Sequence, residues 1–215
     1  MSQVTASTRP YDATSRRAAA HENKQHILYA ARRLFAEQGY VTTTIVQIAS
    51  EASLAPPTVY AAFGSKPGIL KALIAAAVNA PDPPDIQDWM DAAVTASTAP
   101  ERIAHLADGS TEILNRAGDL FAVLHEAKFA DPDLERQWEE GQRRRLDGVS
   151  RVVRALDEDG LIAVGIDPDR AVDVIWSLTS PEMYTLLTKQ RRWSSSRYRT
   201  WLGESIAGAL GEPNE

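Results

Sequence analysis

Residues 43–68 of this 215-residue chain read TTIVQIASEASLAPPTVYAAFGSKPG, a stretch that predicts two short helices joined by a tight turn. Thr44 and Gln47 have the spacing of a capping box, in which each side chain satisfies a backbone N–H at the start of a helix. Ile45 and Ile48 then fall on one face of that first helix. The segment is therefore expected to open with a well-defined helix that buries one side.

The second helix of this pair is expected to begin at Pro56 or Pro57 and to end near Phe63. A proline suits the first helical turn, because the backbone N–H groups there lack helical partners anyway. On this helix Val59, Ala62 and Phe63 should point inward, which leaves the intervening side chains outside. A short second helix held at a fixed angle is suited to entering a DNA groove.

Together with its flanks, this stretch resembles the DNA-binding domain of the TetR family of bacterial transcription regulators. The resemblance covers about residues 24–73. It rests on residues in family order and spacing: Ile27, Ala31, Leu34, Phe35, Gly39, Tyr40, Thr43, Thr44, Ile48, Ala49, Ala52, Thr58, Val59, Tyr60, Phe63, Lys66 and Leu70. Three positions depart from the family pattern, namely Ser53 in place of a turn glycine, Ala55 in place of a capping serine, and Pro57 in place of glycine. Ser53 must then adopt a conformation that glycine adopts more readily, and Ala55 offers no side-chain cap.

The resemblance implies a set of DNA-contacting residues. Pro56, Pro57, Thr58 and Ala61 would face the major groove, and Tyr60, Thr44 and Lys66 would contact phosphates. The complete predicted set is Arg17, Thr43, Thr44, Pro56, Pro57, Thr58, Tyr60, Ala61 and Lys66. Because the recognition helix contains no Arg, Lys, Asn or Gln, hydrogen-bonded base reading should be sparse, with specificity leaning on DNA shape, water or the basic N-terminal tail.

Charge is distributed unevenly along the chain. The whole sequence carries −6, but residues 1–80 carry +4 and the remainder carries −10. This asymmetry fits a basic DNA-facing module on an acidic body. The chain has no cysteine, which excludes disulfides and thiolate metal sites. No apolar run approaches the roughly 18 residues of a membrane span, so a cytoplasmic protein without membrane association is expected.

The fold class predicted from these patterns is all-α, with three domains or segments. Residues 1–19 read as a flexible tail, residues 20–66 as the helix-turn-helix DNA-binding domain with its motif at about 44–63, and residues 67–215 as a helical effector-binding and dimerisation domain. Apolar spacing predicts helices at about 18–38, 66–79, 86–97, 100–116, 118–130, 132–159, 168–188 and 195–210. The Pro-rich segment 80–85 should break the chain near the domain boundary, and Pro181 should kink or restart its helix.

Aromatic residues on the body helices are the candidates for an effector pocket, which the family resemblance locates there. The predicted lining is Trp89, Phe121, His125, Phe129, Trp138, Trp176 and Tyr184. The spacing of Phe121, His125 and Phe129 forms a single helical row, which is also what a plain core would show. By contrast, the run from Arg143 to Arg145 lies in a Glu-rich neighbourhood and is interpreted as a solvated face rather than an anion site.

The last helix carries an apolar stripe made of Tyr198, Trp201, Leu202 and Ile206. The family resemblance assigns this region to a dimer interface; otherwise the stripe closes the monomer. His21 and His26 are five residues apart, which places them about 140° from each other around a helix, so no metal site is expected. Neither His105 nor His125 has a nucleophile motif beside it, and no cofactor is expected.

The predicted function is that of a homodimeric transcription regulator, most simply a repressor, whose partners are a double-stranded DNA operator and a small apolar effector. Effector binding would favour a dimer with misplaced recognition helices. Two alternatives stay open at this point. One is a DNA-binding regulator without a small-molecule effector, and the other, from a different class, is a helical-bundle enzyme.

Overall fold

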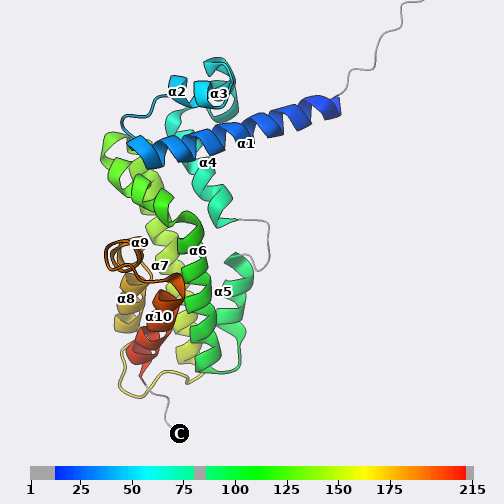
Figure 1. Ribbon diagram of the computed structural model, residues 1–215. Coiled ribbons are helices and arrows are strands. Elements are labelled where there is room, and N and C mark those ends of the chain that lie inside the picture. Colours follow the sequence, from blue (N-terminus) through cyan, green and yellow to red (C-terminus); the bar gives the residue numbers. More distant parts are fainter. Residues whose placement is uncertain (1–12, 80–85, 212–215) are drawn as a thin grey trace, which may run out of the picture.

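The computed structural model describes residues 13–79 and 86–211, and within these ranges the regular structure is helical without any strand. Figure 1 shows an elongated molecule in which α1 (Ala13–Gln38), α2 (Ile45–Glu51) and α3 (Pro56–Phe63) form a head at one end. The other elements form the body or lead into it: α4 (Lys66–Val78), α5 (Ile86–Thr95), α6 (Ala99–Ala127), η1 (Lys128–Ala130), α7 (Pro132–Glu158), α8 (Pro168–Leu178), α9 (Pro181–Thr185), η2 (Leu186–Gln190) and α10 (Ser195–Leu210). No single described helix is both long and apolar enough to cross a bilayer, and only α3 and α4 taken together, bent by 60°, would reach that threshold.

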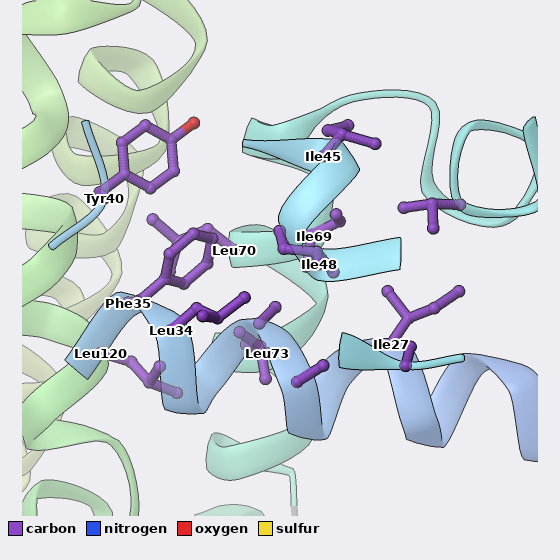
Figure 2. Close-up of a cluster of buried hydrophobic side chains, with 14 of the residues drawn as sticks. Ile27, Leu34, Phe35, Tyr40, Ile45, Ile48, Ile69, Leu70, Leu73 and Leu120 are labelled. Atoms are coloured by element: carbon purple, nitrogen blue, oxygen red, sulfur yellow. The ribbon is translucent and has the colours of Figure 1, made fainter. Parts of the chain in front are cut away.

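The head is closed by a core to which each of its helices contributes. Its most deeply buried side chains include Ile27 and Phe35 from α1, Ile48 from α2 and Val59 from α3. Figure 2 shows Ile27, Phe35 and Ile48 converging with side chains of α4 on the same cluster. These positions follow the apolar spacing of the sequence, so the predicted helix-turn-helix arrangement is confirmed.

The backbone conformation of the turns between the helices of the head depends on the residues that occupy them. Gly39 ends α1 at φ +82°, and the non-glycine Ser53 holds φ +55° between α2 and α3. Both halves of the capping box between Thr44 and Gln47 are formed. Ala55 precedes α3 without a side-chain cap. The sequence departures at positions 53 and 55 therefore leave a less stabilised turn but do not change its path.

The start of the first helix differs from the sequence prediction. The helix α1 begins at Ala13 rather than at about Ala18, so residues 13–19 of the predicted flexible tail are helical. The Ala- and Arg-rich composition of that stretch favours helix, which explains the longer element. The rest of the predicted tail, residues 1–12, and the predicted break at 80–85 lie outside the described residues.

The predicted helices 100–116 and 118–130 are one continuous helix, α6, followed by the short turn η1. Gly118 does not interrupt it. A Cβ atom at this position would lie 3.4 Å from the ring of Tyr184, an ordinary packing distance, so α9 packs against the middle of α6 at this residue. By contrast, the helix predicted at 168–188 does restart at Pro181, where Ser180 accepts a hydrogen bond from the Met183 N–H as the new cap.

Head and body are joined by shared packing and by one polar contact. Leu120, Leu124 and Leu134 of the body belong to the same buried cluster as the head core, and Figure 2 places Leu120 beside α1. Arg32 of α1 donates from Nε and Nη2 to the carboxylate of Asp119 at 3.0 and 2.8 Å. The joint between α1 and α6 is thus held by a bidentate ion pair over an apolar contact.

Candidate DNA-binding surface and ligand cavity

The outer face of α3 is the candidate DNA-binding surface. Val59 is fully buried, whereas Pro57, Tyr60 and Ala61 are exposed and Thr58 is half-buried. The Tyr60 side chain is 54% exposed, which leaves its hydroxyl available to a phosphate. This arrangement brings four of the predicted DNA-facing residues together on one side of the head, and Pro56 lies half-buried at their edge.

Thr44 is exposed next to this surface, but its hydroxyl is already used in the capping box. It accepts from the Gln47 N–H at 3.2 Å and lies 3.0 Å from Gln47 Oε1. Arg17 is exposed in the first turns of α1, away from the core of the head. The phosphate contacts expected of these two residues stay predictions.

The position of Thr43 corrects the sequence prediction of a DNA contact. Its side chain is fully buried, and the hydroxyl donates to the carbonyl of Gly39 at 2.8 Å and accepts from Gln38 Nε2 at 3.1 Å. A side chain enclosed in this way cannot reach a phosphate. Thr43 therefore stabilises the connection between α1 and α2 instead.

Lys66 has a structural role that the sequence did not reveal. Its ammonium group donates to the carbonyls of Tyr40 and Thr43, each at 2.8 Å, and lies 4.2 Å from the centre of the Tyr40 ring. Burial lowers the pKa of Lys66, an effect opposed by the nearby charge of Asp131. The residue thus ties the α1–α2 connection to the start of α4, and any phosphate must compete with these acceptors.

The body encloses a cavity of about 500 Å³ between α4, α5, α6 and α7. Of the predicted effector residues, Trp89, Phe121 and Trp138 line it. Ile74 and Val78 of α4 also line it, although sequence reasoning did not name them. The available signal was that α4 carries apolar side chains on more than one face, which is more than packing against the head requires.

The other predicted pocket residues do not line this cavity. Phe129 is 81% exposed on the η1 turn, where the helix has ended, and this corrects its assignment. His125 packs against Trp138 with ring centres 4.8 Å apart and ring planes tilted by 55°, and its Nε2 lies 3.9 Å from Glu182 Oε1. Tyr184 is buried, with its hydroxyl donating to Asn115 Oδ1. Of the helical row 121, 125, 129, only Phe121 therefore lines the cavity.

Trp176 lines a second, smaller hollow together with Arg145. The guanidinium of Arg145 lies 4.4 Å from the centre of the Trp176 ring and is half-buried. Arg143 and Arg144 are exposed. The interpretation of the arginine run as a solvated face is thus right for two residues and wrong for Arg145, because successive helix positions point in different directions.

The apolar stripe of α10 faces the interior of its own protomer. Tyr198, Leu202 and Ile206 are each fully buried in the body core, and the Tyr198 hydroxyl donates to the Leu178 carbonyl at 2.9 Å. These three side chains are not available to a partner, which corrects their assignment to a dimer interface. Trp201 is half-buried, with its ring centre 5.9 Å from that of Trp193. The stripe closes the monomer, the alternative that the sequence left open.

Among the described residues, no group of three or more His, Asp or Glu side chains is placed to hold a metal ion. Glu112 pairs with Arg116 at 2.7 Å and Asp159 pairs with Arg102, so these carboxylates serve ion pairs. The body thus offers a largely apolar cavity with polar groups at its edge, an arrangement suited to binding an organic molecule.

Comparison with known proteins connects these features to relatives. A family model described as "Bacterial regulatory proteins, tetR family" matches residues 27–73. The HTH-type transcriptional regulator HbdR of Aromatoleum sp. (strain CIB) is 51% identical over 49 residues, which amount to 23% of this chain and 21% of HbdR. The similarity to HbdR therefore covers less than a quarter of either chain.

Solved structures extend the likeness to the body. The regulator FadR from Bacillus subtilis, in complex with stearoyl-CoA, aligns with a TM-score of 0.68 and 20% identity over 87% of this chain and 99% of FadR. The SmeT–triclosan complex aligns with a TM-score of 0.69 and 20% identity over 90% of this chain and 96% of that one. At such identities the likeness shows a common all-α, two-domain fold.

Proposed function

The chain belongs to the TetR family of bacterial regulatory proteins, and from this premise we propose that it is a DNA-binding repressor released from its operator by a small organic effector. The observation that carries the proposal is the exposed outer face of α3 on a head whose core is fully closed. Such a head presents a helix of fixed orientation to a major groove. The protein would act in the cytoplasm, as a regulator rather than as an enzyme.

Recognition would combine phosphate contacts with shape reading. Tyr60 and Thr58 supply hydroxyl groups, while Pro57 and Ala61 supply an apolar edge that fits a thymine methyl group. Arg17 adds a positive charge near the N-terminal end of α1. A helix without long polar side chains makes few hydrogen bonds to bases, so we expect the sequence preference to depend on DNA deformability.

Transmission from the cavity to the head would run through α4. Ile69, Leu70 and Leu73 of this helix are buried in the head core, whereas Ile74 and Val78 line the cavity. An effector that pushes on the cavity side of α4 therefore acts on a helix that also packs against α1. Such an effector lowers operator affinity in proportion to its preference for the displaced arrangement.

The ligand complexes of similar proteins support an effector role for the cavity. FadR from Bacillus subtilis was solved with stearoyl-CoA, and SmeT was solved with triclosan. Both are organic molecules with large apolar parts. The apolar lining of the present cavity, which includes Trp89, Phe121 and Trp138, is compatible with a ligand of that kind.

A homodimer is part of the proposal, because two recognition helices must lie about 34–36 Å apart to read successive turns of one groove face. The inward stripe of α10 leaves the outer surfaces of α8 and α10 for this contact. Val174 of α8 is 38% exposed, and Leu186 of the neighbouring element η2 is 43% exposed. Two helices from each protomer would form a four-helix interface related by two-fold symmetry.

The proposal is tested by selecting binding sites from a randomised duplex library with the full-length protein. We expect the selection to yield a pseudo-palindrome with half-sites one helical turn apart. Fluorescence anisotropy then measures the affinity of the protein for the selected duplex and for a scrambled duplex. Tyr60→Ala should weaken binding, whereas Phe129→Ala, which removes an exposed ring from the body, should not. Equal affinity of the parent protein for selected and scrambled duplexes would reject the DNA-binding function.

A further inference from the structure

Arg145 of α7 holds its guanidinium inside the body, where it joins two helices. Nη1 donates to the carbonyl of Trp176 and to Thr179 Oγ1, the latter at 3.2 Å, and Nη2 donates to Gln142 Oε1 at 2.8 Å. The Trp176 ring covers the cation. These contacts hold the end of α8 against α7, and they fix the position of the positive charge.

That charge is not neutralised inside the described part of the chain. No described carboxylate forms an ion pair with Arg145, and Glu182, which acts on it at longer range, lies 3.9 Å from His125 Nε2 instead. Burial lowers the pKa of Arg145 to about 10, so the group stays protonated at neutral pH. A guanidinium has five N–H donors, and the contacts above leave the Nε hydrogen and one Nη2 hydrogen for a further acceptor.

Arg145 also belongs to the wall of the 500 Å³ cavity. Most of the remaining wall is apolar and includes Trp89, Met90, Leu106, Ile113, Leu114 and Phe121. Among the described lining residues, two further cations, Lys71 and Arg144, face the same cavity from exposed positions, together with one carboxylate, Glu140. The cavity is therefore an apolar space with an excess of positive charge, in which one cation is half-buried and held in place.

We propose that the cavity binds an amphipathic organic acid, with the ligand carboxylate on Arg145 and the apolar part among the side chains of α5 and α6. This inference rests on the proposed effector function and adds the chemical class of the effector. The planar fork of a guanidinium matches a carboxylate in geometry and charge. A neutral alcohol of the same shape forms weaker hydrogen bonds, and an amine of the same shape meets like charge.

The contacts of Arg145 separate a structural role from a ligand-binding role. Nη1 is occupied by Trp176 and Thr179 of the α8 end, whereas the carboxylate would meet Nε and Nη2. If Arg145 were only a clamp between α7 and α8, its replacement would lower stability but the parent protein would show no preference among head groups. Discrimination between ligands that differ only in the head group is therefore the decisive observation.

The first experiment measures head-group preference on the unmodified full-length protein by isothermal titration calorimetry. The probes are decanoate, decanol and decylamine, together with naphthalene-2-carboxylate and naphthalene-2-methanol, so that chain and ring shapes are both represented. We expect at least one carboxylate to bind about tenfold or more tightly than its neutral counterpart, the size of effect that a hydrogen bond to a charged group provides. Equal binding of acid and alcohol, a preference for decylamine, or no binding of either carboxylate would overturn the proposal.

The second experiment assigns the preference to Arg145. Arg145→Met should reduce the ratio of acid to alcohol affinity to about one, and Arg145→Lys should keep part of it because a point charge remains. The matched control is Arg143→Met, which removes an exposed arginine of the same helix that does not line the cavity. If circular dichroism shows that Arg145→Met is unfolded, the comparison rests on Arg145→Lys, and an unchanged ratio in that variant would contradict the assignment to Arg145.

Neither experiment contains DNA, so their outcome is separate from that of the proposed function. A protein that selects a palindrome but shows no carboxylate preference is a DNA-binding regulator to which the inferred ligand class does not apply. A protein that prefers the carboxylate but selects no duplex binds the ligand class without the proposed regulatory role. Loss of DNA binding on adding the preferred carboxylate would unite the two findings.

Discussion

The interiors of the head and the body differ, because the head is closely packed whereas the body contains a cavity and buried polar groups. In the head, Ile27, Ile48, Val59 and Leu70 are completely enclosed in a continuous apolar cluster. The body contains a cavity of about 500 Å³ and a half-buried guanidinium. All four buried side-chain polar atoms that lack a hydrogen-bond partner among the described residues also belong to the body: Arg102 Nη1, Thr111 Oγ1, Arg116 Nη1 and Trp176 Nε1.

This difference fits the two requirements of the proposed function, which are a rigid DNA-binding head and a body that binds an effector. A recognition helix needs a fixed orientation, and close packing provides it because packed side chains resist displacement. A site that responds to a ligand needs space and polar groups that a ligand can satisfy, both of which reduce stability in the empty state. We therefore expect substitutions in the head to act on stability, and substitutions in the body to act on assembly and ligand response.

The largest expected effect concerns assembly through the body. Val174→Glu on the outer face of α8 should give a monomer in sedimentation velocity at micromolar concentration, with the helical content unchanged. Because one head reads only a half-site, specific DNA binding should fall about 10³-fold or more, to the non-specific level. Val164→Glu, the same substitution at a valine that is 88% exposed in the α7–α8 connection, is the control. A dimeric Val174→Glu protein would show that the interface lies elsewhere.

The second prediction compares equivalent aromatic deletions in the two regions. Phe35→Ala removes a ring that is 2% exposed in the head core and should cost about 3–5 kcal/mol of unfolding free energy. Phe121→Ala enlarges a cavity that already exists and should cost roughly 1–2 kcal/mol. Urea denaturation followed by circular dichroism measures both. Equal costs would remove the contrast between a closed head and an open body.

Lys66 and Lys71 provide the third comparison, since both lie on α4 but serve different regions. Lys66→Met removes the ammonium donor from the Thr43 carbonyl and one of the two donors from the Tyr40 carbonyl, and it should destabilise the protein by about 1–3 kcal/mol. Lys71→Met, which removes an exposed lysine at the cavity, should leave stability unchanged within about 0.5 kcal/mol.

DNA binding by the Lys66→Met protein then distinguishes two roles. If Lys66 also contacts a phosphate, the slope of log affinity against log salt should fall by about one relative to the parent protein. An unchanged slope with a reduced melting temperature would assign Lys66 entirely to the connection between α1 and α2.

The smallest expected effect concerns two non-glycine residues that hold a positive φ in the described part of the chain, one in each region. Ser53 in the head and Arg192 in the body hold φ values of +55° and +56°. Replacing either by glycine should stabilise the protein by roughly 0.5–1 kcal/mol, measured as a rise in melting temperature, because glycine adopts this conformation without a steric cost. Ser50→Gly, within α2, should instead destabilise by about 0.5–1 kcal/mol. A loss of stability in Ser53→Gly would mean that the serine side chain itself supports the turn.

The sequence predicted the structure of the head more accurately than that of the body. The head is governed by short-range rules, so the cap at Thr44, the stop at Gly39 and the inward position of Val59 were all predictable from neighbouring residues. The exceptions are Thr43 and Lys66, whose hydrogen bonds depend on the path of the loop between α1 and α2. A buried threonine and an exposed one look alike in sequence.

The body depends on which helices meet, and this is not encoded in local spacing. The stripe containing Tyr198, Leu202 and Ile206 was correctly recognised as apolar, but spacing alone cannot say whether such a stripe faces a partner or its own core. The predicted break between residues 116 and 118 was wrong, because this stretch lies within one helix that packs against Tyr184, a contact that local spacing does not reveal. Arg145 was indistinguishable from Arg143 and Arg144 until the fold showed which one turned inward.

The position of α4 also limits how this regulator can be recombined with others. A chimera joined at residues 66/67, where the sequence suggested a domain boundary, would separate the recognition module from Ile69, Leu70 and Leu73, which complete its core. The exchangeable unit is therefore longer than the helix-turn-helix and extends to the end of α4 at Val78. The recipient must also present a carboxylate at the position of Asp119, since Arg32 otherwise loses its partner at the new seam.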